Sequence, residues 1–231
     1  MITKDKPLVI EFPMRGEWLT PTTPAKQIPS HGTNRMGLRY AYDFLQVDWG
    51  NKNKPFHNVN ALRYLLFGVP LKRCYCWGQN IYAPGDGEIV SVIDDVFERP
   101  IVHWLVDSTI AIKNAIFFNE NKDDYSKIAG NYIIMKYDTG VYLVFAHLQK
   151  NSIRVKLNEK IKKGTILGKI GHSGNSTSPH LHFQVMDHYN PAKAKGIPCV
   201  FEQYELYQDG NWKTVYKQMP SDKDRIRFLG I

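Results

Sequence analysis

The sequence is poor in cysteine and contains no long hydrophobic run. Its three cysteines, Cys74, Cys76 and Cys199, form no even-numbered set for a disulfide framework, so we expect buried thiols rather than a structural zinc knuckle. No segment reaches the about 18 uninterrupted apolar residues of a membrane-spanning helix. The opening MITKDKPLVIEF lacks the basic start, apolar stretch and cleavage site of a signal peptide. These absences predict a chain without a membrane span and leave its localisation open.

Internal repeats and low-complexity tracts are also absent. Of the 231 residues, 43% are hydrophobic and 23% are charged, which is typical of a globular protein and predicts a single domain. The net charge of +8 indicates attraction to a polyanion such as anionic lipid, an acidic cell-wall polymer or nucleic acid. Because no nucleic-acid-binding signature accompanies this charge, we expect no nucleic-acid partner.

Short strands separated by turns dominate the middle and the end of the chain. Four β-rich runs between residues 130 and 187 are NYIIMKY, VYLVFAHL, ILGKIG and HLHFQV. Earlier, RYAYDFLQV alternates so that Asp43 shares a face with Ala41 and Leu45. Near the C-terminus, Asp209-Gly210 separates two alternating runs, which is typical of a hairpin. The pattern predicts a mainly β fold with antiparallel sheets.

Two stretches interrupt this β pattern and predict helical insertions over residues 45–80 and 94–128. The segment NALRYLLFG has Asn60 as an expected N-cap and Gly68 as an expected end. The segment VHWLVDSTIAIKNAIFF has the length of a second helix, although it is rich in β-branched residues. Residues 1–27 are rich in proline and polar groups, and we expect an extended arm without regular elements.

A pair of histidines stands inside one of the predicted strands, in the sequence SPHLHFQV. Because side chains alternate along a strand, His180 and His182 face the same way. They can share a metal, or one can bind a metal while the other acts as an acid, base or hydrogen-bond donor. The alternative is a solvated sheet face that carries two ordinary histidines.

Three further residues are candidates because of their surroundings. His31 lies in the glycine-containing loop SHGTNRMG, Asp43 lies within a strand, and His147 closes the apolar strand VYLVFAHL. A buried carboxylate needs a cation or several donors to remain ionised. Each candidate has a structural alternative: His31 is then an exposed loop residue, Asp43 pairs with Arg39, and His147 is a core histidine bonded to the backbone.

The order of the motifs resembles the zinc metallopeptidases of family M23, the lysostaphin-like or LytM-like cell-wall endopeptidases. The matching segments are SHGTNRMGLRYAYDF, APGDGEIVSV, GNYIIMKYDTGVYLVFAHL and VKLNEKIKKGTILGKIGHSGNSTSPHLHFQV. The resemblance implies an antiparallel β-sheet with a groove over its face, related to the β-sandwiches of biotinyl and lipoyl carriers (a barrel-sandwich hybrid). Within a single domain over 1–231, the family core would cover about 28–190, followed by a hairpin extension over 200–231.

The resemblance also implies the roles of the candidate residues. His31, Asp43 and His182 would hold one Zn²⁺ per chain, and a fourth position left for water is the arrangement of a catalytic zinc. His147 and His180 would be the other two active-site histidines. The family's first motif is a compact H-x-x-x-D, whereas eleven residues separate His31 from Asp43 here. We expect the glycines between them to form a loop that returns His31 to the strand, with His57 as the fallback ligand.

The implied activity is zinc-dependent hydrolysis of peptide bonds in peptidoglycan stems or cross-bridges, which implies an extracytoplasmic location. No H-E-x-x-H motif occurs, so a histidine must act as the general base. We expect His172, in the loop before the H-x-H motif, to lie at the rim of the groove. One alternative function is an inactive LytM-like module that regulates other hydrolases. Another is a lipoyl-like carrier domain, which leaves the histidines unexplained. The oligomeric state stays open.

Overall fold

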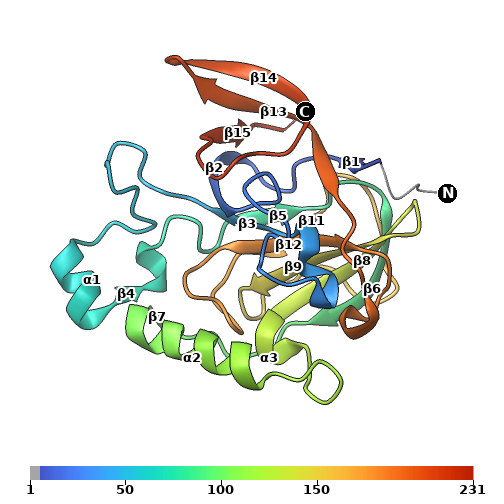
Figure 1. The fold of residues 1–231 in the computed structure, drawn as a ribbon, viewed down its shortest axis with the longest axis horizontal. Helices are drawn as coiled ribbons and strands as arrows, with labels where there is room; N and C mark the ends of the chain where they lie inside the picture. Colours follow the sequence, from blue (N-terminus) through green and yellow to red (C-terminus); the bar gives the residue numbers. More distant parts are fainter. Residues whose placement is uncertain (1–5, 231) are drawn as a thin grey trace.

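The computed structural model describes residues 6–230, which form one large β-sheet, two short sheets and three helices (Figure 1). The strands are β1 (Leu8–Ile10), β2 (Gly16–Thr22), β3 (Tyr42–Leu45), β4 (Val69–Pro70), β5 (Asn80–Tyr82), β6 (Gly87–Ile93), β7 (Ile101–Val102), β8 (Asn131–Tyr137), β9 (Tyr142–Leu148), β10 (Lys160–Ile161), β11 (Ile166–Lys169), β12 (Leu181–Met186), β13 (Cys199–Gln208), β14 (Asn211–Gln218) and β15 (Ile226–Phe228). The helices are α1 (Ala61–Phe67), α2 (Trp104–Phe117) and α3 (Ser126–Ala129).

The large sheet joins both ends of the chain to its middle. Its strand order is β1-β13-β15-β2-β3-β12-β9-β8-β6-β10, and β14 pairs with β13 as a hairpin. The short sheets pair β5 with β11 and β4 with β7. Among the described strands only β1 and β13 pair in parallel, so the predicted mainly β, antiparallel fold is confirmed. No helix in the described part of the chain is long and apolar enough to cross a membrane.

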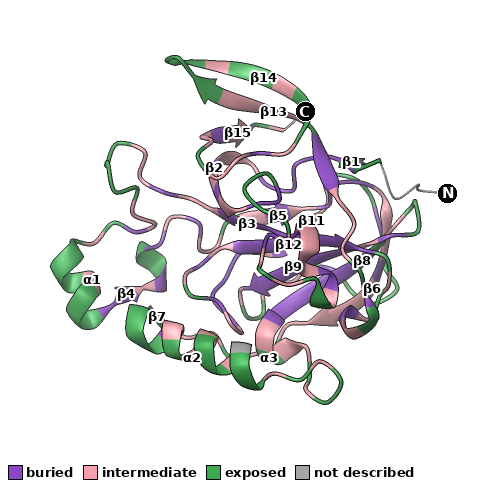
Figure 2. Cartoon of the chain, in the orientation of Figure 1, coloured by how far each residue is buried: buried purple, intermediate pink, exposed green. Residues whose placement is uncertain are grey.

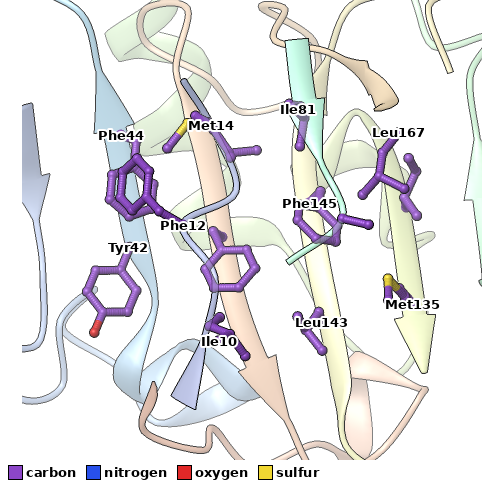
Figure 3. Packing of buried hydrophobic residues seen from close by; sticks show 14 of the residues in the cluster. Ile10, Phe12, Met14, Tyr42, Phe44, Ile81, Met135, Leu143, Phe145 and Leu167 are labelled. Carbon is purple, nitrogen blue, oxygen red and sulfur yellow. The ribbon is translucent and has the colours of Figure 1, made fainter. Parts of the chain in front are cut away.

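The main core lies against one face of the large sheet. Alternate residues of the central strands point into it, including Phe44 of β3, Phe145 of β9 and Phe183 of β12, all fully buried. Figure 3 shows Ile81 of β5 and Leu167 of β11 packing in the same cluster. The residues between these core positions point to the other face, which leaves Asp43 and His182 on the side opposite the core.

The N-terminal segment is part of this core. β1 pairs with β13, and β2 lies between β15 and β3. Between the two strands, the fully buried Phe12 packs edge-on against Phe44 at 5.1 Å and against Phe201 at 4.9 Å. The prediction that this segment lacks regular elements was therefore wrong. The prolines were interpreted as loop markers, but these strands pair with partners that are distant in sequence.

The predicted helices and hairpin are present. α1 begins after Asn60, whose side chain accepts a hydrogen bond from the Arg63 amide at 2.8 Å, and ends at Gly68, which has a φ of 69°. The turn between β13 and β14 contains Asp209 and Gly210, both with positive φ, as a tight hairpin requires. Figure 2 shows that α1 and the outward side of α2 are exposed, whereas the central strands are buried.

The packing of Phe12 generates a test of the N-terminal assignment. We expect Phe12→Ala to lower the free energy of unfolding by about 3–5 kcal/mol, because it removes a buried aromatic ring from the core. The control Val9→Ala changes a side chain that is 39% exposed, and we expect a change of about 0.5 kcal/mol. Urea unfolding measures both variants, and equal effects would contradict the inclusion of this segment in the core.

Candidate active site and metal centre

The candidate site is built on the pairing of β3 with β12. In this antiparallel register Asp43 lies directly opposite His182, on the sheet face that points away from the core. β9 pairs with the other edge of β12 and places Ala146 opposite His182. The next residue, His147, has a φ of 62°, an uncommon backbone conformation for a non-glycine residue and one that is enriched at functional sites.

His31, Asp43 and His182 converge on one point. The His31 Nε2 atom lies 3.2 Å from Asp43 Oδ2, and the His182 Nδ1 atom lies 3.0 Å from Asp43 Oδ1. One ligand atom from each of the three residues lies within 4.8 Å of the others. Two imidazole nitrogens and a carboxylate are a donor set that suits a catalytic zinc ion.

Hydrogen bonds fix the tautomer of His31. The Ser30 hydroxyl donates to the Leu38 carbonyl at 3.1 Å, so it is free to accept a hydrogen bond from His31 Nδ1–H at 3.2 Å. This contact leaves the lone pair of Nε2 directed at Asp43. Outer partners of this kind orient the imidazole ligands of metal sites.

A similar set of hydrogen bonds fixes the tautomer of His182. The Gln184 side-chain NH₂ donates to the Met36 carbonyl at 2.8 Å, which sets the orientation of the amide. The Gln184 oxygen then accepts from His182 Nε2–H at 3.0 Å. The lone pair of His182 Nδ1 is therefore directed at Asp43 as well. Two nitrogen lone pairs and a carboxylate that face one another are an arrangement that a cation completes.

The long loop between His31 and Asp43 depends on a glycine. Gly37 has a φ of 77°, and a Cβ atom at this position would lie 2.7 Å from the Gln184 side-chain nitrogen. The loop can therefore approach Gln184 closely, and it returns His31 to β3 as the glycines of this interval predicted. Arg39 bonds to Asn34 at 2.6 Å instead of pairing with Asp43, which excludes the alternative of a simple surface ion pair.

The charge of Asp43 is set by its histidine neighbours. Burial opposes ionisation of this carboxyl, but the charges of His31 and His180, when these rings are protonated, and hydrogen bonds donated by His182 and His31 outweigh burial and hold its pKa well below the usual value. Asp43 is therefore a carboxylate at neutral pH, the form that binds a metal. A bound cation would replace the protons on the two ring nitrogens that face Asp43.

His147 and His180 lie beside this group, with their rings 4.7 Å apart. His147 Nδ1–H donates to the Ser173 carbonyl at 3.0 Å, and His180 Nδ1–H donates to the Ser178 carbonyl at 2.7 Å. Both rings therefore keep an unprotonated Nε2, and that of His180 lies 3.6 Å from Asp43. Burial, reinforced by His180 and His182, holds the pKa of His147 well below its usual value.

All five predicted residues line a single groove of about 550 Å³. Helices α2 and α3 contribute Asn114 and Ile128 to its wall, and the loop after His31 contributes Arg35. Ala146 of β9 also lines the groove, and it packs with Val144 in a second apolar cluster on this face of the sheet. The groove is therefore bounded partly by the predicted insertion 94–128.

His172 is buried, so the prediction that it lies at the rim was wrong. Its Nδ1 lies 3.1 Å from the Ser176 hydroxyl oxygen, and its Nε2 lies 3.4 Å from Asp107 Oδ2. Ser176 donates to the Ser178 carbonyl at 2.6 Å, the same carbonyl that His180 contacts. A continuous polar chain therefore runs from Asp107 on α2 to the ring of His180.

Arg99 also takes part in this polar network and links Asp107 to the loop before β12. Its guanidinium donates to Asp107 at 2.7 Å and to the Gly174 and Ser176 carbonyls at 2.9 and 2.6 Å. The pKa of Asp107 is lowered, since His172 and Arg99 together outweigh the effect of its burial. Sequence reasoning missed both residues, because no local pattern relates them to a loop some 70 positions later.

His57 lies elsewhere. It is buried in the small cluster beneath α1, and the centre of its ring lies 4.8 Å from that of Tyr64. Its backbone pairs with that of Cys74 in an isolated β-bridge. The structure therefore does not bring the fallback ligand to Asp43. Gln184, which the sequence interpretation also passed over, had a detectable signal: it continues the alternation of His180 and His182 on one strand face.

The sequence matches a known protein family in the region that carries part of the candidate site. Residues 107–194 match the model of peptidase family M23. This segment is similar to the M23 peptidases. The resemblance predicted from the motifs is thereby confirmed, and the M23 segment contains His147, His180 and His182, while His31 and Asp43 precede it.

Several curated relatives are similar to parts of the chain. An uncharacterized metalloprotease of Buchnera aphidicola is 35% identical over 34% of this chain and 21% of its own length. Peptidoglycan DD-endopeptidase ShyC of Vibrio cholerae is 33% identical over 30% of this chain and 16% of its own. DD-carboxypeptidase/endopeptidase Mpg of Neisseria meningitidis is 30% identical over 50% of this chain and 25% of its own. The chain thus spans a quarter or less of these relatives.

Two solved structures are similar in outline. The catalytic domain of lysostaphin from Staphylococcus simulans gives a TM-score of 0.39 at 19% identity, over 79% of this chain and 88% of that chain. A zinc-containing peptidase from Vibrio cholerae gives a TM-score of 0.39 at 18% identity, over 81% of this chain and 38% of that chain.

The hydrogen bond between Gln184 and His182 generates one prediction. We expect Gln184→Leu to weaken metal affinity by about 10–100-fold, because it removes the acceptor that holds His182 Nε2–H. The control Gln208→Leu changes an exposed glutamine at the end of β13 and should leave affinity unchanged. Competition with a chelator measures the affinity, and equal values for both variants would contradict the proposed orientation.

The buried polar network around Asp107 generates a second prediction. Asp107→Asn removes the charge that Arg99 and His172 face, and we expect the free energy of unfolding to fall by about 3–5 kcal/mol. Asp95→Asn, at an exposed position in the same insertion, is the control and should have little effect. Denaturant unfolding compares them, and an unchanged midpoint in Asp107→Asn would show that the network is not needed for stability.

Proposed function

We propose that this chain is a zinc-dependent metalloendopeptidase that cleaves peptide bonds in the stem peptides or cross-bridges of peptidoglycan. The observation that carries the proposal is the convergence of His31 Nε2, Asp43 and His182 Nδ1, each oriented by its own surroundings. The family match and the names of the relatives support a peptidase, and the relatives named as peptidoglycan DD-endopeptidases support the substrate. The proposed location is outside the cytoplasm.

The residues fit one zinc ion. They offer two imidazole nitrogens and an ionised carboxylate, which are zinc ligands that leave further positions open. When bound, zinc supplies a Lewis acid that polarises a peptide carbonyl and makes water more acidic. No thiolate would join these ligands, because the three cysteines are buried elsewhere and burial raises the pKa of each thiol to about 12.

His147 and His180 move protons in this proposal. Both present an unprotonated Nε2, because a backbone carbonyl occupies each Nδ1–H. Such a nitrogen accepts a proton from water and, once protonated, donates a hydrogen bond to the oxyanion or a proton to the leaving amine. The lowered pKa of His147 keeps this ring neutral at neutral pH.

The groove matches a peptide substrate in size and lining. It is open along the sheet face and combines apolar residues, such as Phe118 and Ile128, with the amides of Asn114 and Asn175. The net charge of +8 favours attachment to an anionic wall polymer. We also propose that the whole chain forms one domain, because strands from both ends complete the sheet that carries the site.

Metal content and hydrolysis together test the proposal. We expect about one zinc per wild-type chain by mass spectrometry, and loss of both zinc and hydrolysis of peptidoglycan fragments in Asp43→Ala and His182→Ala. Undiminished hydrolysis by His182→Ala would refute the assigned site. Zinc binding without hydrolysis of any stem or cross-bridge fragment would instead support a wall-binding regulatory module.

The two remaining histidines give a complementary prediction. We expect His147→Ala and His180→Ala to retain zinc and to lower kcat by about 10²–10⁴-fold, because they remove proton transfer and not a ligand. His188→Ala, in the turn after β12, is the control and should retain full activity. Loss of zinc in His180→Ala would show that this residue is a ligand and would contradict the division of roles.

A further inference from the structure

Helix α2 exposes apolar side chains and buries a charged one. Among its described residues, only the charged Asp107 is buried, through its contacts with Arg99 and His172. The exposed residues of the helix are largely apolar: Leu105, Ile112, Ile116 and Phe117 are 54%, 61%, 67% and 72% exposed. A surface helix normally buries its apolar side chains and exposes its polar ones. An apolar outer surface of this kind indicates an interaction site.

Helix α1 extends the same surface. None of its residues is buried, and Leu62, Leu66 and Phe67 are 67%, 56% and 70% exposed. The Trp104 indole at the start of α2 donates to the Leu65 carbonyl at 3.2 Å, and β4 pairs with β7 beside the helices. Figures 1 and 2 show α1 and α2 adjacent at one edge of the molecule, with exposed outer sides. We call the exposed apolar residues of α1 and α2 the helical face.

The chain around α1 is basic and free of acids. Residues 49–85 contain no aspartate or glutamate and carry the exposed cations Lys52, Lys54, Arg63, Lys72 and Arg73. Within residues 6–230, none of these five cations takes part in an ion pair. Of these, Arg63 lies on α1, and Lys72 and Arg73 follow β4, which pairs with β7 beside the helices. An apolar surface next to such unneutralised cations is complementary to a partner that is apolar below an anionic surface.

We propose that the helical face docks on the surface of an anionic lipid bilayer. Leucine, isoleucine and phenylalanine side chains can enter the headgroup and acyl boundary, while the neighbouring lysines and arginines contact lipid phosphates. A second copy of this chain fits less well, because a two-fold symmetric contact would bring the same five cations together. The amphipathic tryptophan Trp104, 42% exposed, is also typical of a membrane interface.

Docking in this way would place the groove next to the bilayer. Helix α2 has one side in the helical face and another in the groove wall, where Ala111 and Asn114 lie. A peptide that enters the groove would therefore do so close to the membrane surface. The inference concerns attachment and does not depend on the proposed peptidase activity.

Vesicle flotation of the full chain tests the proposal. We expect binding to vesicles of equal parts phosphatidylglycerol and phosphatidylcholine, and about tenfold weaker binding to phosphatidylcholine alone. The double variant Leu66→Ser/Ile116→Ser should bind anionic vesicles at least about tenfold more weakly, because it removes apolar insertion from both helices. The matched control Leu157→Ser changes a leucine that is 58% exposed elsewhere and should bind like wild type.

Two charge variants distinguish the effect of the local cations on vesicle binding from the effect of the net charge. Lys72→Glu/Arg73→Glu should weaken vesicle binding, whereas Lys156→Glu/Lys160→Glu, with the same change in net charge at two exposed positions before and in β10, should not. Circular dichroism checks that each variant is folded. Failure of wild type to float, or equal loss in both charge variants, would overturn the proposal. Concentration-dependent dimers that Leu66→Ser/Ile116→Ser abolishes would assign the helical face to a second copy instead.

Discussion

The pairing of β3 with β12 is the constraint on which the site depends. It brings Asp43 opposite His182, which lies 139 positions later in the sequence. The same two strands bury Phe44 and Phe183 on their other face, so core packing and site geometry are coupled through one register. A shift of one residue would move the aromatic side chains to the groove and the site residues to the core.

Precision at the site comes from contacts beyond the candidate ligands. Ser30 and Gln184 select which nitrogen of His31 and His182 carries the proton, and Gly37 allows the intervening loop to approach Gln184. On the other side, the loop before β12 is held by buried polar contacts to Arg99 and Asp107 of the insertion. The insertion thus stabilises the loop beside the candidate site, forms a groove wall and exposes an apolar surface.

Sequence reasoning was strongest where the pattern is local. Alternation predicted β3, β12 and the terminal hairpin, and it placed His180 and His182 on one face. It failed at β1 and β2, which are stabilised by pairing with distant strands and are obscured by prolines. It also failed at His172 and Asp107, because a buried polar contact between a helix and a distant loop leaves no periodic signal. The burial of a residue such as His172 depends on tertiary packing.

The most direct test of the central claim is anomalous diffraction at the zinc edge from crystals grown with zinc. Our account predicts one strong peak between His31 Nε2, the Asp43 carboxylate and His182 Nδ1, with His147 and His180 nearby but outside the first coordination shell. A peak at His57 and Cys74, ligation of His182 through Nε2, or the absence of a peak at Asp43 would contradict it.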